Sequence, residues 1–215
     1  MKFLTLIFSL ILSLFLLHPV EAATTSTVIN KNETEYDAEF LQALQFGFES
    51  WITKFKTIDE FKPYDNVTRE QAAKMIGQFA LEIMNKKLDE TKLCNFIDIN
   101  NADYSLVPHI IKSCKLTIMK WGADGYFLPL ENLSKAQAIT VIIRLFNNWL
   151  MDEWTTPRYR NYFEKAKELW LTKETQIESL ERSLTRYELI LLLYRFYVKN
   201  DLLSKYGNTF DMWNT

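Results

Sequence analysis

Three short segments share one pattern, and this repetition limits the folds open to the chain. In each segment an apolar residue is followed by Thr or Ser, a cation, a variable residue, and Gln or Glu. A hydroxyl residue followed three positions later by Gln or Glu forms a capping box, which starts a helix because each side chain binds the other residue's backbone N–H. The segments are Val67-Thr68-Arg69-Glu70-Gln71, Leu133-Ser134-Lys135-Ala136-Gln137 and Leu184-Thr185-Arg186-Tyr187-Glu188.

Apolar residues recur at intervals of three and four after each capping box, as in a helix with one buried face. The stripes are Met75, Ile76, Phe79, Ala80 and Ile83, then Val141, Ile142, Leu145, Phe146 and Trp149, then Leu192, Leu193, Phe196 and Tyr197. The chain has only five Gly and five Pro, and few segments alternate like strands. We predict an all-α fold in which three helical hairpins close as a pseudo-threefold bundle.

The cation in each box is unfavourable for a helix start, because the N-terminus carries partial positive charge and a cation there costs about 0.3–1 kcal/mol. A cation beside free backbone N–H groups is suited to bind an anion. We therefore expect Arg69, Lys135 and Arg186 to contact an anionic ligand. The alternative is that each side chain is simply solvated.

These residues resemble three S-layer homology (SLH) repeats, the modules that attach exported bacterial proteins to the cell wall. The second copy is the most complete. It has Phe96-Ile97-Asp98, an expected helix to about Cys114, and Asp124-Gly125-Tyr126-Phe127-Leu128-Pro129 before its capping box. This order is similar to the family pattern F-x-D, D-G-x-F-x-P and T-R-x-E. Of the D-G-x-F-x-P element, the first copy keeps only Phe61-Lys62-Pro63, and residues 173–183 of the third copy contain neither Gly nor Pro.

The resemblance implies a non-catalytic module that binds an anionic secondary cell-wall polysaccharide, in the family typically one with pyruvate ketals. The three cations would hold the carboxylate in grooves between repeats. Asp124 lies in the expected turn, and Trp121 beside it either stacks on a sugar ring or folds onto the core. A competing interpretation is an envelope scaffold that binds other S-layer or envelope proteins through the aromatic tail, which contains Phe210, Met212 and Trp213.

The N-terminus resembles a secretory signal peptide. Lys2 precedes fifteen uncharged residues, 3–17, and Val20-Glu21-Ala22 provides a cleavage site. We expect export to the cell surface; an uncleaved anchor is the alternative, and no later segment is long enough to span a membrane. The expected divisions are signal peptide 1–22, flexible leader 23–34, repeats 35–87, 93–150 and 154–200, and C-terminal tail 201–215.

Cys94 and Cys114 are expected to form a disulfide, as in most exported chains, with two buried thiols as the alternative. His109 and two Cys make an incomplete metal-ligand set, so no metal site is expected, and no cofactor motif is present. The net charge of −2 argues against nucleic acid as a partner. Because no catalytic triad or apolar-flanked carboxylate pair is recognisable, we expect no enzyme activity; a two-carboxylate glycosidase is the remaining alternative.

Overall fold

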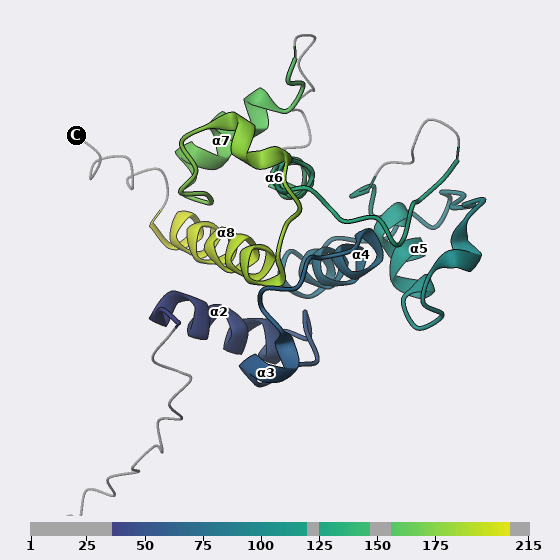
Figure 1. The fold of residues 1–215 in the computed structure, drawn as a ribbon, viewed down its shortest axis with the longest axis horizontal. Helices are drawn as coiled ribbons and strands as arrows, with labels where there is room; N and C mark the ends of the chain where they lie inside the picture. Colours follow the sequence, from purple (N-terminus) through teal and green to yellow (C-terminus); the bar gives the residue numbers. More distant parts are fainter. Residues whose placement is uncertain (1–35, 120–124, 147–155, 207–215) are drawn as a thin grey trace, which may run out of the picture. The chain divides into compact units, whose positions relative to one another are not determined.

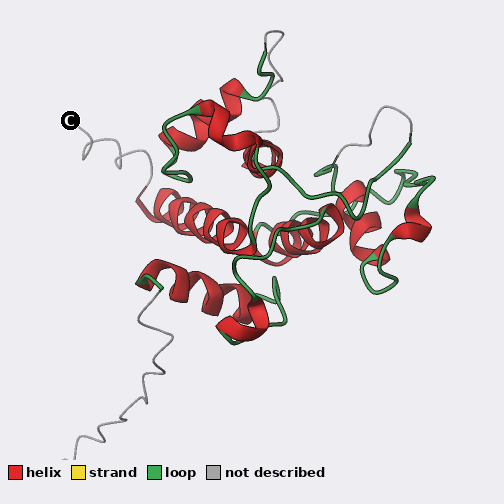
Figure 2. Ribbon diagram, in the orientation of Figure 1, coloured by secondary structure: helices red, strands yellow, loops and turns green. Residues whose placement is uncertain are grey.

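The computed structural model describes residues 36–119, 125–146 and 156–206. These lie in the unit Tyr36–Thr215, and the expected signal peptide and leader lie outside the described residues. The described part is helical and contains no strand, which confirms the all-α prediction (Figure 2). Its elements are α2 (Ala38–Glu49), α3 (Ile58–Phe61), α4 (Arg69–Gln78), π-helix η2 (Phe79–Ile83), 3₁₀-helix η3 (Ile99–Asn101), α5 (Val107–Lys115), α6 (Lys135–Phe146), α7 (Arg160–Glu168), 3₁₀-helix η4 (Ile177–Glu181) and α8 (Arg186–Tyr206).

All three predicted capping boxes form, and they start α4, α6 and α8. In the second box, the Ser134 N–H donates to Gln137 Oε1 at 3.0 Å and the Gln137 N–H donates to Ser134 Oγ at 3.2 Å. The Thr68–Gln71 pair has the same two bonds. Glu188 replaces Gln in the third box and accepts from the Thr185 N–H at 3.2 Å.

The residues that precede the boxes form a closed cycle of backbone hydrogen bonds. Val67 N–H donates to the Leu184 carbonyl at 2.9 Å, Leu133 N–H to Val67 at 2.8 Å, and Leu184 N–H to Leu133 at 2.8 Å. All three side chains are at most 1% exposed. The three helix starts are therefore joined at one buried point, although long segments separate them in the sequence.

The helix pairing differs from the hairpins expected within each repeat. Among the described helices, the most extensive pairings are α4 with α5, α6 with α7, and α2 with α8 (Figure 1). The capped helices α4 and α6 thus pack against α5 and α7, each the first helix of the following expected repeat, and α8 packs against α2 of the first expected repeat. Contacts between residues that are distant in the sequence determine this pairing of helices, so the local sequence pattern did not reveal it.

Gly47 determines how closely two helices approach. It is buried inside α2, which continues to Glu49. A Cβ at this position would lie 2.5 Å from Ile190 Cδ1 of α8. Gly47 therefore allows α2 and α8 to approach closely.

Most residues of the predicted stripes belong to the buried core of the described ranges: Met75, Ile76, Phe79, Ala80, Val141, Ile142, Leu145, Leu192, Leu193 and Phe196 are at most 7% exposed. Ile83 is only partly buried, Tyr197 is exposed, and Trp149 is outside the described residues. In α2, Phe40 and Leu44 are buried, whereas Phe48 is exposed.

Two boundaries also move. The helical stripe expected from Met75 to Ile83 changes to a π-helix at Phe79, and α8 continues to Tyr206, beyond the expected start of the tail. The Cys94–Cys114 disulfide is present, as predicted, and ties the segment before η3 to α5. None of the helices in the described ranges is both long and apolar enough to cross a membrane.

Candidate functional site

The loop before α6 is held by a buried carboxylate. Asp98 is 8% exposed and accepts from the Phe127 N–H at 2.8 Å and the Leu128 N–H at 2.7 Å. Leu128 has a φ of 60°, and Lys62, in the corresponding Phe-x-Pro segment before α4, has a φ of 50°. The two segments thus share a backbone conformation that directs the Phe carbonyl to a cation of another repeat.

Arg69 is one of these cations. Its Nε donates to the Phe127 carbonyl at 2.7 Å, and its guanidinium lies 5.1 Å from the centre of the Phe127 ring. Burial lowers the pKa of Arg69 from its ordinary value, while the charges of Glu131 and Asp98 oppose this shift. Arg69 still carries its charge because an arginine pKa lies far above neutral pH. A nearby anionic ligand stabilises the charged form of a partly desolvated cation of this kind.

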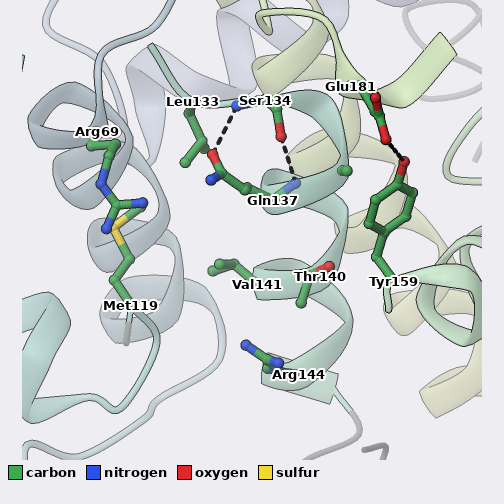
Figure 3. A pocket seen from close by; sticks show the side chains of 11 residues that line it. Arg69, Met119, Leu133, Ser134, Gln137, Thr140, Val141, Arg144, Tyr159 and Glu181 are labelled. Carbon is green, nitrogen blue, oxygen red and sulfur yellow. Dashed lines mark hydrogen bonds between the residues drawn. The ribbon is translucent and has the colours of Figure 1, made fainter. Parts of the chain in front are cut away.

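Arg69 faces a cavity of about 400 Å³ between the start of α4 and one face of α6. Figure 3 shows Arg69 and Met119 on one side, the side chains of α6 next to them, and Tyr159 with Glu181 beyond the helix. The lining residues are Arg69, Met119, Leu133, Ser134, Ala136, Gln137, Thr140, Val141, Arg144, Tyr159 and Glu181. The wall therefore combines two guanidinium groups with hydroxyl, amide and aliphatic groups.

The far wall of this cavity, which we call the Arg69 cavity, is held by polar contacts. Arg144 Nε donates to the Tyr162 hydroxyl at 3.1 Å, and the Arg144 guanidinium lies 5.0 Å from the Tyr162 ring centre. The Tyr159 hydroxyl donates to Glu181 Oε1 at 3.0 Å. Burial, together with this hydrogen bond, raises the pKa of Tyr159 to about 12. Tyr159 therefore remains a neutral hydrogen-bonding group at physiological pH.

Lys135 lies in a different environment. It is 7% exposed, and its Nζ lies 2.7 Å from Glu174 Oε1 and 3.0 Å from Glu188 Oε1. Arg182 joins the same cluster, with 2.5 Å between its Nη2 and Glu188 Oε1. The second predicted cation is thus neutralised by side chains of the third repeat.

The carboxylates of this cluster are held ionised. Burial would raise the pKa of Glu188, but hydrogen bonds from Arg182 and Lys135 outweigh it and lower the pKa to about 2. The hydrogen bond from Lys135 is the main cause that lowers the pKa of Glu174. Both acids are therefore anions at neutral pH, and they occupy the position next to Lys135 that an external anion would need.

A second cavity of about 240 Å³ occurs beside this cluster. Its lining includes Lys135 and, from α8, Tyr187, Glu188, Leu191, Leu192 and Arg195. Counted from the helix starts, these five positions match Ala136, Gln137, Thr140, Val141 and Arg144 in the Arg69 cavity. The two cavities are repeats of one arrangement. They differ in charge, because Glu188 replaces Gln137, and Arg195 pairs with Glu39 at 2.5 and 2.6 Å.

Arg186, the third predicted cation, is partly buried and has internal partners. Its Nη1 donates to the Phe61 carbonyl at 3.0 Å and lies 3.6 Å from Asp65 Oδ2. The bond to Phe61 corresponds to the bond between Arg69 and Phe127. Arg186 therefore helps to join the third and first repeats.

The sequence prediction and the cavity overlap only in part. Arg69 lines the Arg69 cavity, whereas Trp121 and Asp124 are outside the described residues. Arg144, Thr140 and Tyr159 were not predicted. Arg144 could have been found from the sequence, because it follows Lys135 by the same interval that separates Arg195 from Arg186.

Comparisons with known proteins give limited information. No family model matches the chain. It is 32% identical over 105 residues to an endoglucanase of Bacillus sp. (strain KSM-635). The match covers 47% of this chain and 11% of the endoglucanase, so the chain corresponds to a small part of that protein. Within the described residues, no group of three or more His, Cys, Asp or Glu side chains is arranged to hold a metal ion.

Proposed function

We propose that the chain is a non-catalytic module of three SLH-type repeats that binds an anionic cell-envelope polysaccharide in the Arg69 cavity. The observation that carries the proposal is the position of Arg69, which is partly desolvated and lines a cavity with Arg144 and several hydroxyl and amide groups. Guanidinium groups bind carboxylates through paired N–H donors, and the hydroxyl and amide groups suit sugar hydroxyls.

The backbone cycle supports the three-repeat assignment. Val67, Leu133 and Leu184 occupy the same place before each capping box and bond to one another in turn. The resemblance to the endoglucanase is consistent with a carbohydrate-binding role, because the shared segment is only 11% of that protein. A segment of this size fits an accessory module carried beside a catalytic part. Export to the cell surface and attachment to the wall belong to the same proposal.

The name of that relative also favours a second candidate, a glycan-hydrolysing enzyme. Such an enzyme needs one carboxyl group that stays protonated as the acid. The acids Glu174 and Glu188 beside Lys135 have lowered pKa values, and Glu181 in the Arg69 cavity accepts a bond from Tyr159. The ionised Glu174 and Glu188 suit ion pairing better than proton donation. We therefore favour binding.

Binding to purified cell-wall polysaccharide, measured before and after its acidic groups are neutralised, tests the proposal. We expect the native polymer to bind and the neutralised polymer to bind at least about tenfold more weakly, as for loss of a carboxylate from an arginine site. Equal affinity for both polymers would reject an anion site. Release of reducing sugar from the polymer would favour the enzyme.

A further inference from the structure

Helices α5 and α7 end in the same way, and α2 ends in a related turn in which Thr53, not Ile52, donates to the Gly47 carbonyl. In α7, Trp170 N–H donates to the Lys167 carbonyl at 2.9 Å and Leu171 N–H to the Ala166 carbonyl at 2.9 Å. This is a Schellman motif, in which the residue after the cap adopts a left-handed conformation. In α5, Thr117 and Ile118 make the corresponding bonds. In α2, Trp51 takes the left-handed place and bonds to the Phe48 carbonyl at 3.2 Å.

The left-handed residues are unusual. Glycine is the common choice there because a side chain is disfavoured at positive φ. Trp51 has a φ of 60° and Trp170 a φ of 58°. Their side chains are nevertheless 76% and 68% exposed, so burial of the indole does not compensate for the backbone conformation. Two large aromatic rings are thus presented to solvent at equivalent positions where folding alone would favour glycine.

The residues after Trp170 connect it to the second cavity. A buried aliphatic residue, Ile52 or Leu171, comes next and fixes the turn. Leu171, Thr172 and Lys173 all line the second cavity, so Trp170 immediately precedes its wall. Met119 follows Thr117 by two residues, as Thr172 follows Trp170, and it lines the Arg69 cavity. The Schellman turns after α5 and α7 therefore stand next to the two cavities.

An exposed lysine follows each Trp by three residues: Lys54 after Trp51 and Lys173 after Trp170. The Thr between them accepts a backbone N–H at 3.2 Å in both segments, from Phe55 to Thr53 and from Glu174 to Thr172. The two segments thus repeat the same turn with the same combination of indole and cation.

We infer that Trp51 and Trp170 are stacking platforms for sugar rings of an anionic polysaccharide; Trp170 stands beside the second cavity. This inference rests on the proposed function and adds contacts outside the Arg69 cavity. A single indole face matches one sugar ring, and the nearby lysine complements a negative polymer. A protein interface, by contrast, needs about 800 Å² on each partner around an apolar centre.

The test uses the full chain and purified cell-wall polysaccharide. In Trp51→Gly, Trp170→Gly and the double variant, relief of the left-handed conformation offsets the added chain entropy of glycine. We therefore expect the melting temperature to stay within about 2 °C of the parent, which corresponds to less than about 1 kcal/mol. The polysaccharide dissociation constant should rise at least about fivefold in the double variant, and phenylalanine at both positions should restore part of the affinity.

Thr117→Gly is the matched control, because it changes the same position of the third helix end without removing an aromatic ring; its affinity should not change. Unchanged affinity in a folded double-glycine variant would overturn the inference. Loss of self-association with unchanged polysaccharide binding would also overturn it and identify a protein contact. Arg69→Ala separates the two proposals: if it lowers affinity while the tryptophan variants do not, the Arg69 cavity stands and the platforms fail.

Discussion

Lys135 Nζ lies 3.0 Å from Glu188 Oε1, and this ion pair joins the starts of α6 and α8. Glu188 also belongs to the capping box of α8. One carboxylate thus starts a helix and neutralises a cation of the preceding repeat. This dual role explains why the second cavity, although built like the first, is not the site proposed for an anion.

Glu188→Gln should destabilise the fold by about 2–3 kcal/mol. Glutamine keeps the capping box, but it leaves the buried Lys135 with Glu174 as its remaining carboxylate. Urea unfolding at pH 7 measures the change. Glu90→Gln is the control, because Glu90 pairs with Lys115 at the surface and its loss should cost less than about 1 kcal/mol. Equal effects of the two substitutions would contradict a special role for the buried cluster.

The same carboxylate predicts acid sensitivity. The folded-state pKa of Glu188, about 2, lies below its ordinary value of 4.5, so folding favours the ionised form. Its contribution is complete above about pH 5 and is lost as the pH falls toward 2. The melting temperature of the parent should therefore fall more steeply over this range than that of Glu188→Gln. Parallel curves would show that Glu188 does not titrate with folding.

Asp98→Ala should cost about 2–4 kcal/mol, because two backbone N–H groups lose their acceptor. It should also weaken polysaccharide binding, since the Phe127 carbonyl that positions Arg69 lies in the released loop. Urea unfolding and a binding titration measure the two effects. Asp103→Ala removes an exposed carboxylate that accepts two hydrogen bonds from Ser105. This variant should leave binding unchanged.

Reduction of the Cys94–Cys114 disulfide should lower the free energy of unfolding by about 3 kcal/mol, because the bond closes a loop between residues 20 positions apart. Melting curves with and without a thiol reductant measure this. The double variant Cys94→Ala/Cys114→Ala should melt like the reduced parent and should not respond to the reductant. A response in this variant would show that the reductant acts elsewhere.

The sequence predicted the structural features that depend on residues close together in the chain. Each capping box lies within four residues, so the starts of α4, α6 and α8 and most of their buried faces could be identified. The disulfide followed from the expected compartment of the chain.

What the sequence did not reveal depends on distant contacts. The close approach of Ile190 to Gly47 is one such contact, because no residue near Gly47 in the sequence indicates it. The partners of Lys135 lie 39 and 53 residues away, so its neutralisation could not be read from its own motif. Arg144 belongs to the Arg69 cavity only because α6 lies across from the start of α4.

The most direct test of the central claim is the affinity of Arg69→Ala for purified anionic cell-wall polysaccharide, compared with Lys86→Ala, which removes an exposed cation distant from the cavity lining. We predict that Arg69→Ala raises the dissociation constant at least about tenfold, while Arg69→Lys has an intermediate effect because it keeps the charge but loses the paired donors. Lys86→Ala should bind like the parent. An Arg69→Ala variant that is folded and binds with the parent's affinity would contradict the account.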